Sequence, residues 1–339
     1  MEQTQENFME ETPEQKRIRF WRRLENQGKG WLYILPVLLL MAVFTFYPLV
    51  RSFIGAFQQA LDGTTNTFEG YGLENFKYVL TYGKFRYCLV NTLLFAFISV
   101  PISTLLALFI AVGLNAIKPL REVFQTLFFL PYLTNSIAVG AVFAAMFSVI
   151  GTEPNVQSYG LINNLFGTKV DWLNIYVVEP ESYANDWAAW WHAVTDSSIW
   201  PARWVVLIYE IWAGLPFKIL ILFGALQNVN KQYYDAAKID GATKWTTLWK
   251  VTVPLISPML SYLIVTGFIG GFKAYTALVG IFGKDKVSKS YINTVVGFIY
   301  DQIGVSRVGV ASAAALVLFA IILLFTLINL HMSKKRVHY

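Results

Sequence analysis

The sequence predicts an all-α membrane protein with six transmembrane helices and both termini in the cytoplasm. Of its 339 residues, 55% are hydrophobic and only 14% are charged, whereas a soluble domain carries about a quarter charged residues. The apolar residues are gathered in runs of about twenty or more, the length of a helix that crosses roughly 30 Å of hydrocarbon. Lys and Arg collect beside alternate ends of these runs, as they do in cytoplasmic loops.

Each expected span is an apolar run with few charged residues. Prolines fall in or near several runs, which transmembrane helices tolerate because neighbouring helices and water satisfy the freed carbonyls. Trp and Tyr are abundant, and both favour the two membrane interfaces. The six expected spans are 31–53, 89–114, 123–150, 199–226, 255–281 and 308–330.

The orientation follows from the basic residues. They occur in the N-terminal segment, in the second-to-third and fourth-to-fifth connections, and in the C-terminal tail. With six spans these four segments share one side, which should be cytoplasmic. The opposite loop, 151–198, is acidic and should be extracytoplasmic, although the loop after the fifth span carries lysines on that side. Residues 1–28 should form a polar cytoplasmic extension, and 29–335 the membrane domain.

Several kinds of chemistry are not expected. Cys88 is the single cysteine, which excludes an intramolecular disulfide framework and a cysteine metal cluster. The three histidines are too dispersed to suggest a metal site, and no catalytic cluster is present. Gly283-Lys284 lacks the earlier glycine of a phosphate-binding loop, because Leu278 stands there. The basic residues lie beside apolar runs, which favours anionic lipid over nucleic acid as their partner.

The cytoplasmic segment 231–258 has a pattern that an ordinary loop lacks. Residues 231–239 should form a short helix that ends at Asp240-Gly241, because Gly readily adopts a positive φ. Thr243 should cap a second helix that runs to about Thr252, and Pro254 should then redirect the chain into the fifth span. The expected product is a helix–turn–helix with a small-residue surface that another protein can approach closely.

This segment resembles the EAA loop of ABC importer permeases. The acid of that motif is Asp235 here instead of the usual Glu, so the charge is kept with a shorter reach. Asn91-Thr-Leu and Phe128-Phe-Leu-Pro131 match other parts of the family, and the resemblance covers about residues 30–335. It is closest to the carbohydrate, MalF-like branch. The positions that it assigns to ATPase coupling are Asp235, Ala236, Ala237, Asp240, Gly241, Ala242, Trp249 and Pro254.

The resemblance implies the type I permease fold and a place in the bacterial inner membrane as a multi-pass subunit. It implies a pathway for a sugar or oligosaccharide that an extracytoplasmic solute-binding protein delivers. The other expected partners are a second permease subunit, of a different chain, and two ATPase subunits. ATP and Mg²⁺ would bind to the ATPase subunits, and no cofactor is expected in this chain.

Substrate contacts are sought among polar groups inside the spans, because such groups usually face a cavity. Lys273 in the fifth span would favour an anionic sugar, such as a uronate or a sugar phosphate. Its alternatives are a pairing with a nearby acid or a side chain that snorkels to the interface. Lys218, near a possible kink at Pro216, could reach polar surroundings. The resemblance to MalF-like permeases, aligned on Pro254 and Pro258, implies sugar contacts at Thr266, Gly270 and Lys273 and near Leu215. With the polar groups inside the spans, the expected pathway residues are Glu210, Leu215, Thr266, Gly270, Lys273, Tyr275 and Thr276.

Other functions stay open at this point. An importer of glycerol phosphate or another polar solute would have the same cytoplasmic segment 231–258. A stand-alone secondary transporter would need an ion relay and often a repeated half, but Glu210 alone could start such a relay and no repeat is visible. A membrane enzyme would need a nucleophile, a metal or an acid–base cluster. Dependence of uptake on ATP separates the first of these from the others.

Overall fold

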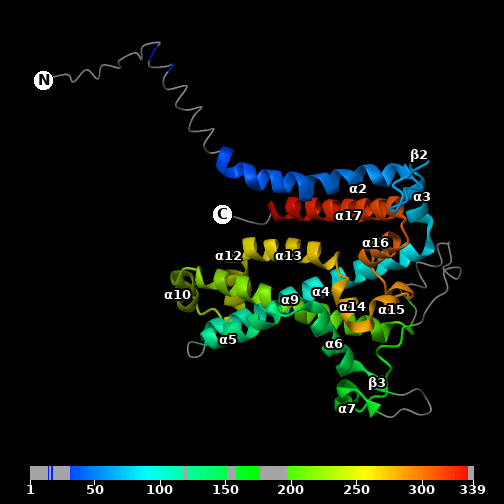
Figure 1. Ribbon diagram of the computed structural model, residues 1–339. Helices are drawn as coiled ribbons and strands as arrows, with labels where there is room; N and C mark the ends of the chain where they lie inside the picture. The colour runs from blue at the N-terminus through cyan, green and yellow to red at the C-terminus, as the bar shows by residue number, and fades with distance from the viewer. Residues whose placement is uncertain are drawn as a thin grey trace. The chain divides into compact units, whose positions relative to one another are not determined.

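The computed structural model describes residues 14, 17, 31–117, 121–150, 158–175, 195 and 197–334. Almost all of the predicted N-terminal extension, and much of the predicted loop 151–198, lie outside these residues. The described chain is helical apart from two small antiparallel sheets (Figure 1). One sheet pairs β1 (Gln58–Gln59) with β2 (Gly70–Tyr71), and the other pairs β3 (Val149–Ile150) with β4 (Ser158–Tyr159).

Four helices in the described part of the chain are long and apolar enough to cross a membrane. They are Trp31–Phe57, Gly83–Ala116 in α4, Trp200–Gln227 in α9, and Val308–Met332 within α17 (Val308–Lys334). Two further helix pairs reach the same standard only together, Val123–Leu133 with Ser136–Phe147 and Lys244–Leu255 with Ser257–Gly271. The four helices and two pairs correspond to the six predicted spans, which confirms the all-α membrane fold.

The predicted third span is broken, with a bend of 96°. It consists of α5 (Arg121–Phe129), the 3₁₀ turn η2 (Leu130–Leu133) and α6 (Ser136–Phe147). The local sequence explains the break. Pro131 has no N–H to donate, and the side chain of Asn135 caps α6 by accepting hydrogen bonds from the backbone N–H groups of Ile137 and Ala138, at 2.9 and 3.3 Å.

The prediction of one continuous fifth span over 255–281 is wrong. The chain forms α13 (Ser257–Gly271), leaves the helix over residues 272–275, and resumes as α14 (Thr276–Phe282). Gly270 and Gly271 weaken the helix at this point. The hydroxyl of Thr294 donates to the carbonyl of Ala274 at 2.8 Å, which satisfies a group that the break leaves without a helical partner.

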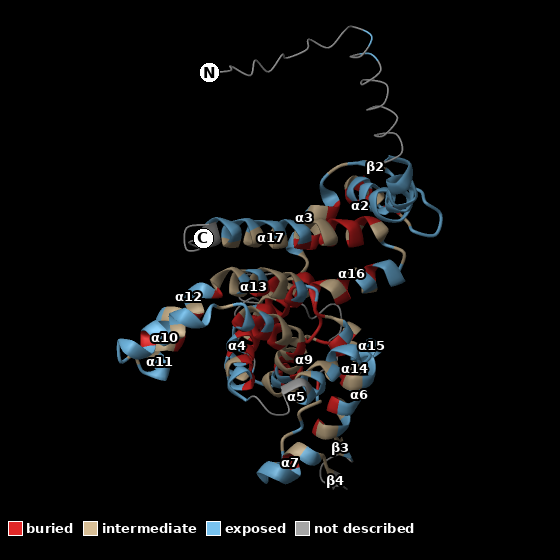
Figure 2. Ribbon diagram, turned by 90° about the vertical axis from the view of Figure 1, so that its left-hand side faces the viewer, coloured by how far each residue is buried: buried red, intermediate tan, exposed pale blue. Residues whose placement is uncertain are grey.

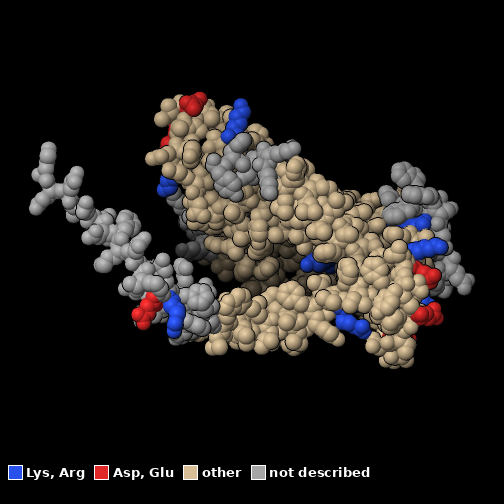
Figure 3. Space-filling view, turned by 90° about the horizontal axis from the view of Figure 1, so that it is seen from above, with Lys and Arg blue, Asp and Glu red and all other residues tan. Residues whose placement is uncertain are grey.

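The core lies where α4, α9 and α13 meet (Figure 2). α4 packs along α9 and α13, and α6 packs against α14. Pro101 in α4 and Pro216 in α9 lie inside helices that continue through them. On the face seen in Figure 3, uncharged side chains form most of the surface, as expected for a protein that spans a membrane. The described chain also contains the shorter helices α3 (Glu74–Thr81), α7 (Leu161–Phe166), α15 (Lys284–Ser288) and α16 (Val295–Gly304).

Candidate functional site

Residues 231–258, which we call the docking loop after the role that the resemblance implies, begin with the helix that the sequence predicts. α10 spans Lys231–Ile239, and the side chain of Asn230 caps it by accepting from the N–H of Gln232 at 3.0 Å. The helix ends at Asp240, and Gly241 follows with a φ of +71°. A residue with a Cβ is disfavoured at this φ, so the glycine sets the sharp exit from the helix.

The second helix of the docking loop also starts as predicted. The hydroxyl of Thr243 accepts from the N–H of Thr246 at 3.2 Å, and α11 (Lys244–Thr247) continues as the π-helix η4 (Leu248–Thr252) and α12 (Val253–Leu255). The chain turns into the fifth span as predicted, but not at Pro254 itself, which lies within the helical run that continues from α11 through α12. The 72° bend follows α12 instead, at Ile256.

The docking loop presents most of its predicted coupling positions to the surface. Ala237 is buried and Ala242 is half-buried, whereas the other six are exposed. Asp235 forms an ion pair with Lys238 at 3.0 Å, and both side chains are exposed. Such a pair contributes little stability, so the carboxylate can exchange its partner. Ile239, which follows Lys238, is 87% exposed, and such exposure is unusual for a large apolar side chain.

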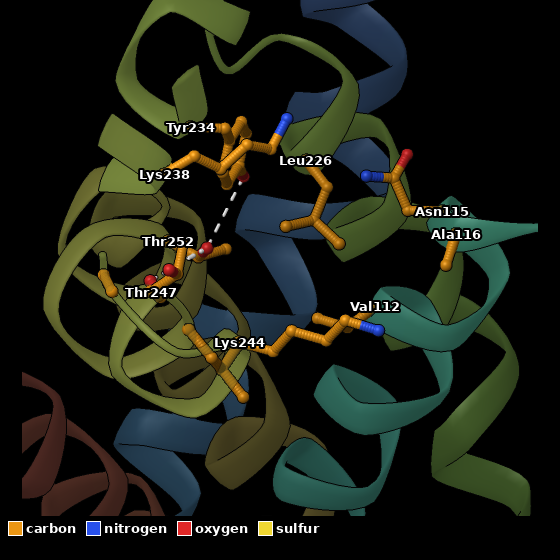
Figure 4. A pocket seen from close by; sticks show the side chains of 11 residues that line it. Val112, Asn115, Ala116, Leu226, Tyr234, Lys238, Lys244, Thr247 and Thr252 are labelled. Atoms are coloured by element: carbon orange, nitrogen blue, oxygen red, sulfur yellow. Dashed lines mark hydrogen bonds between the residues drawn. The ribbon is translucent and has the colours of Figure 1, made fainter. Parts of the chain in front are cut away.

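Aromatic contacts attach the docking loop to α4. The ring of Trp245 stacks on Phe109 with centroids 6.1 Å apart, and Trp249 meets Trp245 edge-on at 5.8 Å. Between the loop and the ends of α4 and α9 lies a cavity of about 310 Å³ (Figure 4). Across its wall the hydroxyl groups of Thr252 and Tyr234 lie 3.5 Å apart. The Trp245–Phe109 stack joins the docking loop to α4, and the other two contacts hold the loop itself together.

A second cavity, of about 420 Å³, lies between α4, α9 and α13. We call it the central cavity. Three predicted pathway residues line it: Glu210 from α9, and Thr266 and Gly270 from α13. The structure adds small polar residues and aromatic rings that the sequence analysis did not select. These are Ser99, Ser103, Tyr132 and Phe217, and they surround Lys218, which the sequence analysis expected to reach polar surroundings.

Lys218 is the cation of the central cavity. Its side chain is buried, and its Nζ donates to the hydroxyl of Ser103 at 2.6 Å and to the carbonyl of Val100 at 3.2 Å. Two glycines leave room for it. A Cβ on Gly267 would lie 3.5 Å from Nζ and 2.9 Å from Val100, and a Cβ on Gly214 would lie 3.9 Å from Nζ.

Four of the predicted pathway residues do not line this cavity. Leu215 packs against the apolar cluster near the docking loop. Lys273 is exposed in the break after α13, Tyr275 stacks on Tyr300 at 5.0 Å, and Thr276 is exposed at the start of α14. The last three lie away from the cavity because the chain leaves the helix after Gly271, whereas Leu215 faces the apolar cluster from α9. Ser99 and Ser103 could have been found from the sequence, since their spacing of four places both on one face of a helix.

At the end of the bundle opposite the docking loop, a buried polar network joins distant segments. Arg203 is fully buried, and its Nε and Nη2 donate to the side-chain oxygen of Asn91 at 3.1 and 3.0 Å. The amide of Asn91 donates to the carbonyl of Asn293 at 3.0 Å, and the side chain of Asn293 donates to Asp301 at 2.9 Å. Lys84 pairs with the same carboxylate at 3.1 Å. The network fastens α4, α9 and α16 together.

Comparison with solved structures shows the same architecture in transporters. A crystal structure of a bacterial ABC transporter involved in the import of the acidic polysaccharide alginate has a chain that aligns with a TM-score of 0.70. The alignment covers 94% of this chain and 99% of that one, at 20% identity. A second structure, the alginate transporter in complex with an alginate pentasaccharide-bound periplasmic protein, aligns with a TM-score of 0.67 at 21% identity.

Comparison with known sequences identifies relatives of similar length. The chain is 28% identical over 295 residues to the probable ABC transporter permease protein MG188 of Mycoplasma genitalium, covering 86% of this chain and 82% of the relative. It is 27% identical over 320 residues to the arabinooligosaccharides transport system permease protein AraP of Bacillus subtilis, covering 92% and 91%. Residues 81–338 match one family along most of the chain, so this protein belongs to the binding-protein-dependent transport system inner membrane components.

Proposed function

We propose that this chain is a permease subunit of an ATP-driven ABC importer and forms part of the pathway for a sugar or oligosaccharide. The single observation that carries the proposal is the docking loop, in which two capped helices present exposed coupling positions at one end of the bundle. The subunit would work in the bacterial inner membrane with a second permease chain, two ATPase subunits that bind ATP and Mg²⁺, and an extracytoplasmic solute-binding protein.

The connection from the docking loop to the central cavity supports coupling. After the bend at Ile256 the chain enters α13, which contributes Thr266 and Gly270 to the cavity wall. The stacked rings of Trp245 and Phe109 tie the loop to α4, which lines the same cavity. A movement imposed on the docking loop by an ATPase would therefore shift two walls of the cavity together.

The lining of the cavity supports a saccharide as cargo. Tyr132 and Phe217 stack at 5.8 Å and both face the cavity, which offers apolar surface to the C–H face of a sugar ring. Thr266 and Ser99 supply hydroxyl groups that can exchange hydrogen bonds with sugar hydroxyls. Relatives named as permeases for arabinooligosaccharides, lactose, and trehalose or maltose favour the same class.

The lysines of the docking loop favour a cytoplasmic position for this end of the bundle. Lys231, Lys238, Lys244 and Lys250 all lie within it, and short cytoplasmic loops are rich in Lys and Arg. The ATPase subunits would then meet the loop from the cytoplasm, and the Arg203–Asn91 network would lie on the outer side.

The test is uptake of labelled oligosaccharide into proteoliposomes that hold the full complex, with and without ATP. We expect uptake only with ATP and with the ATPase subunits. Gly241→Val should reduce ATPase binding and uptake together, because a β-branched residue is strongly disfavoured at a φ of +71°. Gly224→Ala in α9 is the matched control, because a Cβ there meets open space at an ordinary φ.

Two results would contradict this proposal. Uptake that persists without the ATPase subunits would indicate a secondary transporter. A Gly241→Val complex that binds ATPase and transports as the unmodified complex does would remove the docking role of the loop. An excess of glycerol phosphate, added as a competitor, tests the alternative cargo: it should leave oligosaccharide uptake unchanged.

A further inference from the structure

The central cavity carries a positive charge that no ion pair cancels within the described part of the chain. The ion pairs there are Lys84–Asp301 and Lys238–Asp235. Lys218 instead contacts two neutral oxygens, the hydroxyl of Ser103 and the carbonyl of Val100. Neutral dipoles orient an ammonium group but leave its net charge in place. A charge kept inside a membrane protein is costly, which points to a functional use.

The surroundings of Lys218 fix the charge at the cavity wall. Gly214 and Gly267 lie beside its Nζ, where larger side chains would crowd it. Both acceptors of its hydrogen bonds lie on α4, whereas the lysine belongs to α9. The ammonium group is therefore held between two helices before any ligand arrives, which lowers the entropic cost of binding an anion.

Glu210 places a carboxyl group in the same cavity. It lies eight residues before Lys218 on α9, or about 12 Å along a helix. The two groups form no ion pair, so the cavity has a basic region and an acidic region. A ligand that matches both carries an anionic group at one position and hydroxyl donors at another.

We propose that Lys218 binds the carboxylate of an acidic saccharide during its passage, while Glu210 accepts hydrogen bonds from hydroxyl groups of the same molecule. A carboxylate carries a single negative charge, which one lysine can balance. A phosphate monoester carries about −1.5 to −2 at neutral pH, which one lysine does not balance. The inference rests on the proposed function, since it names the cargo class of that pathway.

The experiment compares an oligosaccharide of hexuronate units with the same oligosaccharide after reduction of its carboxyl groups. Both are offered to proteoliposomes that hold the full complex, its binding protein and ATP. The binding protein is the same in all arms, so a difference between variants belongs to the permease. We expect Lys218→Gln to lower the initial uptake rate of the acidic saccharide about tenfold or more, and that of the neutral one less than about threefold, since tenfold corresponds to roughly 1.4 kcal/mol of lost charge interaction.

Three further variants separate charge from structure. Ser103→Asp keeps the lysine but pairs it with a carboxylate, so it should show the same selective loss even if Lys218→Gln fails to assemble. Lys218→Arg keeps the charge and should keep most of the acidic uptake. Lys77→Gln is the matched control, because Lys77 is exposed on α3 and does not line the cavity.

Several outcomes overturn the inference. Equal losses for both saccharides in Lys218→Gln and Ser103→Asp would give Lys218 a structural role only. A selective loss in Lys273→Gln but not in Lys218→Gln would move the anion site to the other lysine. A wild-type complex that imports the neutral saccharide but not the acidic one contradicts this inference alone, whereas a wild-type complex with no ATP-dependent uptake of either contradicts the proposed function as well.

Discussion

Asn91 shows how a single buried amide can organise this membrane protein. Its oxygen accepts two hydrogen bonds from the guanidinium group of Arg203, and its nitrogen donates to the backbone carbonyl of Asn293. These groups come from α4, α9 and the segment before α16. In a low-dielectric interior each such bond is strong, and a group deprived of its partner keeps its full desolvation cost.

Replacing Asn91 should therefore destabilise the protein more than replacing an exposed asparagine. We expect Asn91→Leu to lower the free energy of unfolding by about 3 kcal/mol or more, because hydrogen bonds to charged groups contribute about 1.5–3 kcal/mol each. Asn164→Leu in α7, where the side chain is exposed, is the control. Thermal unfolding of the purified protein in detergent measures the difference, and equal unfolding temperatures would contradict the role of the network.

Lys218 and Lys273 show what sequence reasoning could and could not establish at this scale. Both are recognisable as cations within apolar runs. The sequence analysis placed Lys273 in the substrate pathway, because it treated the fifth span as unbroken. The structure puts Lys218 in the cavity through contacts with Ser103 and Val100, more than a hundred residues away along the chain. Such partners are set by helix packing, and no local pattern around Lys218 encodes them.

The crossing of α6 and α14 depends on two glycines. A Cβ added to Gly140 would lie 2.7 Å from the Cα of Gly280, and a Cβ added to Gly280 would lie 2.8 Å from the carbonyl oxygen of Ile137. These are backbone atoms, which cannot turn aside as a flexible side chain can. Close backbone approach through small residues is a common basis of helix packing in membranes.

Enlarging either glycine should separate these helices. We expect Gly280→Ala and Gly140→Ala each to destabilise the protein by about 1–3 kcal/mol, the usual cost of an overpacked contact. Gly113→Ala in α4 serves as the control, because a Cβ there meets no atom within 4 Å and alanine favours the helix. Unfolding midpoints in one detergent would test this, and a Gly280→Ala midpoint at or above that of Gly113→Ala would exclude a tight crossing.

The docking loop offers a prediction about its second helix. Thr243→Ala removes the hydroxyl that accepts from the N–H of Thr246, and loss of such a cap costs about 1 kcal/mol. If the ATPase binds the folded loop, its affinity should fall about fivefold, the equivalent of that energy. Thr243→Ser keeps the hydroxyl and should bind normally. Titration of the ATPase onto immobilised permease measures both, and equal affinities for the two variants would show that the cap is dispensable for docking.

Helix boundaries that depend on neighbouring residues could be predicted from the sequence, whereas those that depend on contacts between distant segments could not. Gly241 and Thr243 determine the turn and the second start of the docking loop within a few residues, so both could be predicted. The break after Gly271 could not, because glycines are common in transmembrane helices. Its stability depends on Thr294, which contacts the carbonyl of Ala274 from twenty residues further along. The sequence analysis placed the bend at Pro254, because proline commonly redirects a helix, whereas the structure has the bend at Ile256.

The central cavity lies between an exposed end of the helix bundle and an end that a buried polar network holds together. At one end the docking loop is exposed and leads through a bend into α13. At the other end the buried network of Arg203, Asn91 and Asp301 fastens three helices. An input at the docking loop would therefore move the near ends of α4 and α13 against a fixed far end. The cavity wall formed by α13 should be open to water, in contrast to the packed part of α4 around Cys88.

Thiol labelling tests that contrast within one chain. Cys88 on α4 is 1% exposed, so the unmodified protein should resist a charged, membrane-impermeant thiol reagent until it is denatured. Gly270→Cys should react in the folded protein, because a Cβ at Gly270 meets no atom within 4 Å and this residue lines the cavity. Mass spectrometry of each thiol gives the extent of labelling. A Gly270→Cys thiol that reacts only after denaturation would mean that the cavity is closed to water in the resting complex, and a change in its rate on adding ATP would show that the wall moves with the ATPase cycle.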